Sequence, residues 1–402
     1  MQKFEKHSPV VVTEVTTKHE LRQFMQYPNR LYADNPNYIP SFYGDDLSDW
    51  TPGKNPAFDY CEARCWLARR DGEIVGRIGA ILSHKANDKF GTHRMRFSQV
   101  DFVDDSEVSA ALFGTVERWA REKGCDQVHG PLGFTDMDRE GMLVEGFDRR
   151  SLFFTNYNAP YYLEHLTRLG YRKDVDWIEY RITVPEPGGA EAERLHKLSE
   201  FILKRKHLHV ATVHHKSEYG PFVRQVFELV NAAYAPLYGV VELSDEQIER
   251  YANKFIPLVD PDFVCFVVDE QDQLVAFGVT ALDPSVALKH SDGRLFPFGW
   301  AGVLNDLHHS DTLIMLLTAV RPDLQTEGIN AVMMDHVCQS CNRHGVRFAE
   351  TGPMLELNDH ILAQWKRLEK EQHKRRRCFV KVLTPAPQES AAAATAPAGA
   401  AE

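Results

Sequence analysis

Residues 316–333 combine the residue types of a phosphate-binding loop. The apolar run 316–320 leads through Pro322 into Gln325, Thr326, Glu327, Gly328, Ile329 and Asn330, after which a helical pattern begins. A strand that turns into a helix start leaves backbone N–H groups free to bind an anion, and a glycine lets that anion approach closely. We predict that this loop holds a pyrophosphate group.

Two carboxylates downstream of the loop are candidates for proton transfer. Glu350 ends a short apolar segment, and Glu356 lies in the next loop, shortly before Asn358. Acyl transfer to an amine requires a base that keeps the amine neutral. Glu350 is the first candidate for this base and Glu356 the second, and the alternative for each is a solvated loop carboxylate without a role in chemistry.

A second acidic group lies in the first half of the chain. Asp136, Asp138, Glu140 and Glu145 crowd the loop between Gly130-Pro131 and Tyr157. Long loops in compact domains are often functional, so this one either forms a pocket for a cationic acceptor or merely covers the sheet. The residues alone do not decide between the two.

Two clusters are predicted to have no special role. Cys338 and Cys341 share a helix face, but His336 and His344 do not align with each other on that helix, so we predict no metal site. The basic run 374–377 precedes a strand, and we interpret it as a solvated turn rather than as a contact to nucleotide phosphates.

The elements that must position these residues occur twice, in the same order. Each half has a hairpin (65–80 and 264–279), then a helix that ends at a glycine and a strand that closes in Gly-Pro. A further helix begins near an asparagine, at Asn158 in the first half and from Asn358 to Leu368 in the second. In the second half, Ser244 with Gln247 three residues on predicts a capping box at a helix start. This order predicts an α/β (α+β) fold with helices on a largely antiparallel sheet. We place the domains at 1–187 and 188–383 and expect a disordered tail at 384–402.

The loop 325–330 resembles the acyl-CoA-binding motif of the GNAT acyltransferase superfamily, with Asn330 where that motif has glycine or alanine. The order of elements is similar to two tandem GNAT domains. The stretches 35–40, 76–78 and 141–148 are similar to a bacterial tandem-GNAT family without an assigned substrate. This resemblance implies an N-acyltransferase that uses acetyl-CoA or another acyl-CoA and acts on a small-molecule amine or a peptide.

The resemblance also implies roles for individual residues. The cofactor would contact residues 325–330 and Asn358, and backbone N–H groups near Ala319 and Val320 would face the oxyanion. The position of the usual tyrosine acid falls on Trp365, which is unable to donate a proton usefully. The corresponding first-half loop carries Asp104 and Asp105, which would repel a pyrophosphate, so we expect CoA to bind the second half.

Composition narrows the remaining alternatives. The chain has 402 residues and a net charge of −11, which argues against a protein that neutralises nucleic acid. Seven cysteines without framework spacing and the lack of a long apolar run predict a cytoplasmic protein that is not embedded in a membrane. The alternatives are a non-catalytic acyl-CoA-binding scaffold and a Fem-like transferase that uses aminoacyl-tRNA; the oligomeric state stays open.

Overall fold

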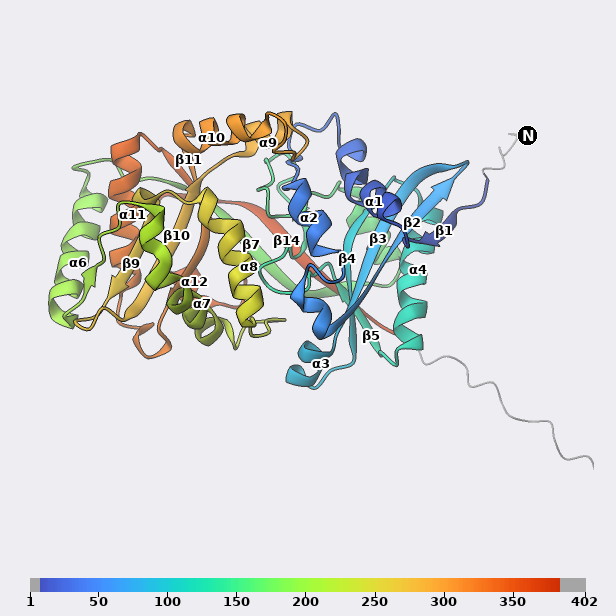
Figure 1. Cartoon of the computed structure of the whole chain (residues 1–402), viewed down its shortest axis with the longest axis horizontal. Helices are drawn as coiled ribbons and strands as arrows, with labels where there is room; N and C mark the ends of the chain where they lie inside the picture. Colours follow the sequence, from blue (N-terminus) through green and yellow to red (C-terminus); the bar gives the residue numbers. More distant parts are fainter. Residues whose placement is uncertain (1–7, 384–402) are drawn as a thin grey trace, which may run out of the picture.

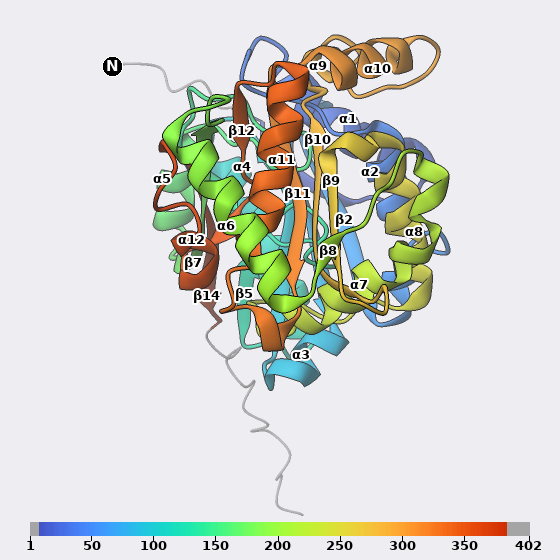
Figure 2. The ribbon, with the colours of Figure 1, turned by 90° about the vertical axis from the view of Figure 1, so that its left-hand side faces the viewer.

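The computed structural model describes residues 8–383, so the predicted tail at 384–402 lies outside the described residues. Helices cover both faces of one long twisted sheet that runs through both halves of the chain (Figures 1 and 2). The mixed α/β class predicted from the sequence is confirmed. Within the described residues, no helix is long and apolar enough to cross a bilayer.

The first half supplies seven strands and five helices to this architecture. In chain order they are β1 (Val11–Glu14), α1 (Lys18–Leu31), α2 (Tyr43–Asp49), β2 (Cys61–Arg70), β3 (Glu73–Ser83), α3 (His84–Phe90), β4 (Arg94–Phe102), α4 (Ser106–Glu122), β5 (Gln127–Gly130), β6 (Met142–Glu145), α5 (Tyr161–Arg168) and β7 (Arg172–Thr183).

The second half supplies the remaining elements. They are α6 (Ala190–Lys206), β8 (His209–Val210), α7 (Gly220–Tyr234), α8 (Asp245–Phe255), β9 (Val264–Val268), β10 (Leu274–Leu282), α9 (Ser285–His290), α10 (Gly299–His309), β11 (Thr312–Val320), α11 (Asn330–His344), β12 (Phe348–Glu350), β13 (Met354–Leu355), α12 (Asp359–Ala363) and β14 (Lys370–Val382).

The sheet order shows that the two halves exchange their last strands. The order is β1-β2-β3-β4-β5-β14-β7-β12-β11-β10-β9-β8, so β14 of the second half pairs with β5, and β7 of the first half pairs with β12. Strands β7 and β14 pair with each other, antiparallel, from Ile182 opposite Lys370 to Arg172 opposite Val380. The predicted boundary at 187–188 therefore divides the sequence, while the sheet continues across it.

Each face of the sheet is covered by a separate apolar cluster. In the first half, α4 and α5 cover one face through residues such as Phe113 and Tyr162, and α1 and α2 cover the other through Phe24 and Trp50. In the second half, α6 and α11 pack on one face and α7 and α8 on the other. Burial of these side chains is the main force that holds the layers together.

Most locally encoded elements match the sequence predictions. Both hairpins are present as β2–β3 and β9–β10. Ser244 and Gln247 form the predicted capping box of α8, in which each side chain bonds the other residue's backbone N–H. The helix predicted from Asn358 to Leu368 is wrong in length, because α12 ends at Ala363.

The basic run 374–377 was predicted as a solvated turn, and this prediction is wrong. Lys374 and Arg376 lie in β14 with fully buried side chains. The Lys374 ammonium lies 3.1 Å from a carboxylate oxygen of Glu179 on β7, and the Arg376 guanidinium donates to the other oxygen of that carboxylate. A buried charge is tolerated only when it is paired, so the exchange of strands supplies the partner for each ion.

Burial alone would raise the pKa of Glu179, but the charges of Arg376 and Lys374 outweigh burial and lower the pKa to about 2. Ionised Glu179 therefore stabilises the fold fully above its ordinary pKa of 4.5. This stabilisation is lost as the pH falls from about 4.5 towards 2.

Replacing Glu179 tests the buried ion pairs at the exchanged strands. We expect Glu179→Gln to lower the free energy of unfolding by about 3–5 kcal/mol at neutral pH, because it removes the carboxylate partner of buried Arg376 and leaves buried Lys374 with Glu350 alone. Urea denaturation measures this loss. Glu193→Gln, which removes an exposed pair with Lys197, is the control and should change stability by less than about 0.5 kcal/mol. Equal effects of the two variants would contradict the prediction.

Candidate active site

Strands β11 and β12 diverge and open a gap in the second half of the sheet. They pair in parallel only at Thr312, Leu313 and Ile314. Beyond that point β12 follows β7, and β13 pairs with β7 as well. A bulge at Leu316 shifts the register between β10 and β11 at the same level. The edge of β11 from Met315 onward therefore lacks a strand partner on this side within the described residues.

Two pockets lie at this gap, one on each face of the sheet. They share the lining residues Met315, Leu317, Thr318 and Trp365. We name them the α11 pocket and the α7 pocket after the helices that flank them. Because Trp365 is only 5% exposed and lines both, its indole separates the two spaces at the gap.

The α11 pocket offers about 730 Å³ of space between its atoms, part of which is open to solvent, and has an almost wholly apolar wall. Its wall is built by α11, by α6, by the ends of β7 and β12, and by the segment after α12. The polar side chains that reach it are Thr280, Thr318, Asn330 and Gln364. This composition suits a ligand that is largely hydrocarbon and carries few polar groups.

The α7 pocket has a volume of about 910 Å³ and contains carboxylates. Tyr234 and Tyr238 form one side, and Asp136 and Glu140 reach in from the first-half loop. Burial raises the pKa of Asp136 to about 6. Burial and then the neighbouring Asp136 raise the pKa of Glu140 well above its ordinary value. The acidic loop of the first half is thus part of a pocket. The first of the two alternatives predicted for this loop, a pocket for a cationic acceptor, requires such a position.

Two polar atoms of opposite character remain unpaired, one in the wall of each pocket. The Nε2 amide of Gln364, in the wall of the α11 pocket, is buried and has no hydrogen-bond partner among the described residues. The Oδ2 atom of Asp136, in the wall of the α7 pocket, is also buried and without a partner in the described part of the chain. A buried unpaired polar group costs free energy, so both atoms indicate missing ligand atoms.

The predicted phosphate loop lies between β11 and α11. Gly328 has φ +79°, and an added Cβ there would lie 3.2 Å from Ile202. No side chain caps the first turn of α11, whose N-cap is Ile329, and Asn330 lines the α11 pocket. The loop therefore presents free N–H groups at the mouth of that pocket.

The other residues predicted in this region are placed as follows. Gln325, Thr326 and Glu327 are exposed; the Gln325 amide donates to the Val320 carbonyl, and Glu327 pairs with Lys206. Ala319 and Val320 lie in β11, paired with β10.

The comparisons with known proteins agree with this architecture. No protein-family profile matches the chain. It is 13% identical, with a TM-score of 0.53, to a tandem GNAT protein from the clavulanic acid biosynthesis pathway, and the match covers 94% of this chain and 99% of that one. A GCN5-related N-acetyltransferase from Sphaerobacter thermophilus gives a TM-score of 0.50 at 13% identity over 94% and 96% of the two chains. The chain has a tandem GNAT fold.

Two curated proteins are similar in sequence along this tandem GNAT chain. Protein YghO of Escherichia coli (strain K12) is 27% identical over 93% of this chain and 95% of its own length. A bacterial ceramide synthase of Caulobacter vibrioides (strain NA1000 / CB15N) is 28% identical over 73% of this chain and 75% of its own length. The chain thus resembles a ceramide synthase over about three quarters of its length.

The two predicted catalytic carboxylates of the tandem GNAT chain lie outside both pockets. Glu350 is 3.2 Å from the buried Lys374 ammonium. Glu356 is 2.5 Å from Lys173 and accepts a hydrogen bond from the Asp176 backbone. Asn358, predicted to contact the cofactor, caps α12 and lines the α7 pocket rather than the α11 pocket.

Sequence reasoning missed Gln364, although it singled out the adjacent Trp365. Nothing in the local pattern distinguishes Gln364 from a surface residue. Only the folded structure shows that the Gln364 side chain lies in the apolar wall of the α11 pocket.

The first-half counterpart of the phosphate loop is closed by its own side chains. Asp105 caps α4 by accepting from the N–H groups of Glu107 and Val108, and its carboxylate pairs with Arg70. Those N–H groups are the ones that an anion would need.

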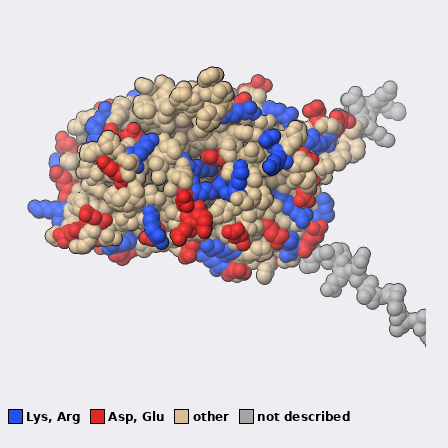
Figure 3. Space-filling model, in the orientation of Figure 1, with Lys and Arg blue, Asp and Glu red and all other residues tan. Residues whose placement is uncertain are grey.

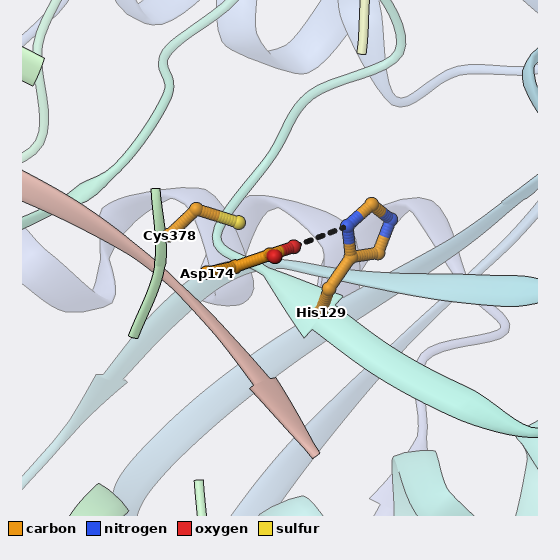
Figure 4. Close-up of side chains that lie close together, drawn as sticks. All are labelled: His129, Asp174 and Cys378. Carbon is orange, nitrogen blue, oxygen red and sulfur yellow. Dashed lines mark ion pairs between the residues drawn. The ribbon is translucent and has the colours of Figure 1, made fainter. Parts of the chain in front are cut away.

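His129, Asp174 and Cys378 come from β5, β7 and β14 and meet where the two halves join (Figure 4). The Tyr238 hydroxyl stands among them, 2.9 Å from His129 Nδ1, 2.6 Å from Asp174 and 3.5 Å from the Cys378 sulfur. Burial, followed by Arg96 and Arg94, lowers the pKa of His129 well below its ordinary value. The three groups therefore act as partners of a buried tyrosine, and this tyrosine also lines the α7 pocket.

Removing the Tyr238 hydroxyl tests this interpretation. We expect Tyr238→Phe to lower the free energy of unfolding by about 1–3 kcal/mol, because buried polar groups lose their shared partner. Tyr43→Phe is the matched control, since the Tyr43 hydroxyl makes no hydrogen bond to the described part of the chain, and it should be nearly neutral. Denaturant unfolding of both variants gives the comparison, and an unchanged stability of Tyr238→Phe would refute the role.

Proposed function

We propose that this protein is an acyl-CoA-dependent N-acyltransferase whose second half binds CoA. The α11 pocket takes the acyl donor and the α7 pocket takes the amine acceptor. The observation that carries this proposal is a pair of complementary unpaired atoms, one in the wall of each of the two pockets that share Trp365. Gln364 offers a hydrogen-bond donor on the donor side, and Asp136 offers an acceptor on the other side.

The residues at the α11 pocket fit an acyl-CoA. The uncapped start of α11 and Gly328 suit its pyrophosphate, and the unpaired edge of β11 suits the amides of its pantetheine arm. Bound there, the cofactor supplies the acyl group as an activated thioester. The first half lacks an equivalent site, because Asp105 already occupies the N–H groups of α4.

Each side of the gap has a chemical task that its residues can perform. An amide N–H, such as that of Gln364, stabilises negative charge that develops on a carbonyl oxygen. Asp136, with a pKa of about 6, is ionised at neutral pH and can accept the proton of an amine. We favour Asp136 and Glu140 over Glu350 and Glu356 as bases, because both latter residues are held by cations outside the pockets.

The ceramide synthase relative supports an amine acceptor. A ceramide is an amide of an amino alcohol, so its synthesis joins an acyl group to nitrogen. Carboxylates in the α7 pocket suit the ammonium form in which such an amine arrives. We therefore propose a small-molecule amine, rather than a peptide, as the acceptor.

Neutralising Asp136 tests the proposed base. We expect Asp136→Asn to lower kcat/KM by about 10²–10⁴-fold. In the unmodified protein, kcat/KM should rise with pH through about 6 as Asp136 loses its proton, and the variant should lack this step. Glu350→Gln is the comparison and should retain the step. Loss of the step in Glu350→Gln but not in Asp136→Asn would restore Glu350 as the base.

Placing a charge in the phosphate loop tests the CoA site. We expect Gly328→Asp to weaken acetyl-CoA and CoA binding by about tenfold or more in calorimetric titration, because a carboxylate would face the pyrophosphate. Gly188→Asp is a matched control, since Gly188 has a similar φ of +74° and open space around it, but lies in the loop before α6. Equal binding by both variants would exclude this loop as the phosphate site.

A further inference from the structure

We infer that the far end of the α11 pocket, formed by Leu195, Cys341 and the end of β7, holds the hydrocarbon chain of a long acyl group and limits its length. This inference rests on the proposed function, since it assigns a chain to the donor in that pocket. It goes further by naming the class of acyl group, a long unbranched one, and the residues that select it.

The wall of the α11 pocket is more polar near the phosphate loop and more apolar farther along α11. Three of the four polar lining residues, Asn330, Thr318 and Gln364, belong to the start of α11, to the diverging part of β11 and to the segment after α12. The fourth, Thr280 of β10, already donates its hydroxyl to the Phe263 carbonyl. Along α11 the later lining residues are Met333, Met334, Val337, Cys338 and Cys341. From Asn330 to Cys341 the helix rises by about 16 Å, so the apolar part extends well beyond the loop.

Only an apolar group suits this far end. A pantetheine arm contains two amides, and each loses hydrogen bonds to water unless the protein replaces them. The unpaired edge of β11 beyond Ile314 can replace them, whereas the side chains of the far end cannot. A hydrocarbon chain, by contrast, gains free energy from each methylene that it buries there.

Three side chains that line the far end are buried. Cys341 is 1% exposed, Ile182 is 2% exposed and Leu195 is 4% exposed, and all three belong to one buried cluster with Val184 and Ala349. Helix α6 packs against α11 from outside (Figure 2). A chain that enters from the gap therefore reaches a fixed wall, and a longer chain would have to displace core side chains.

Calorimetric titration with CoA and an even-numbered series from acetyl-CoA to palmitoyl-CoA tests the inference without any acceptor. We expect the dissociation constant to fall by up to about fourfold per added methylene and then to level off. Cys341→Phe should weaken palmitoyl-CoA binding by about tenfold or more and change acetyl-CoA binding by less than about twofold. Leu195→Ala, which enlarges the far end, should move the levelling-off to longer chains.

Cys125→Phe places the same substitution in the core of the first half, outside the pocket, and controls for a general effect on folding. Unchanged chain-length dependence in both Leu195→Ala and Cys341→Phe would overturn the inference. Binding of CoA and every acyl-CoA with equal affinity would also overturn it, while the proposed function would stand. Failure of CoA and of all acyl-CoAs to bind would contradict both the inference on chain length and the proposed function.

Discussion

Glu179, Lys374 and Arg376 lie at the centre of the sheet, where the last strand of each half has crossed into the other half. Their charges are fully buried, so each depends on partners from other strands: Glu179 pairs with both cations, and Lys374 also pairs with Glu350 of β12. Misaligning β7 and β14 by one residue would turn these side chains to the opposite face and separate the charges. The pairs therefore fix the register from which the rest of the sheet extends in both directions.

The exchange also explains why a gap opens beside β11. Strands β12 and β13 both pair with β7, and only three residues of β12 remain beside β11. The first half has the same divergence, with β4 and β5 paired from Arg94 to Arg96. There the segment after β5 bonds across the opening, because Arg96 donates to the Gly133 carbonyl and the Leu132 N–H donates to the Phe97 carbonyl. Acidic and basic side chains are interspersed over the face of the molecule that Figure 3 shows.

Local sequence patterns predicted the elements that depend on local forces. The hairpins, the capping box at Ser244 and the repeated order of elements follow from turn residues and short-range hydrogen bonds. The burial of Lys374 and the role of Gln364 depend on strands and loops that are distant in sequence, and no short-range pattern carries that information. The basic run was misinterpreted for this reason, because its counter-ions lie almost two hundred residues upstream.

Strand exchange has a consequence for the order in which the protein is made. A ribosome completes the first half well before it reaches β14, and nascent domains generally fold as soon as they emerge. Here the place between β5 and β7 stays vacant until the final described strand is synthesised, which leaves two unpaired strand edges exposed during translation. The first half therefore completes its sheet only after the second half has been made, and a chain truncated before Lys370 would expose a binding surface for chaperones.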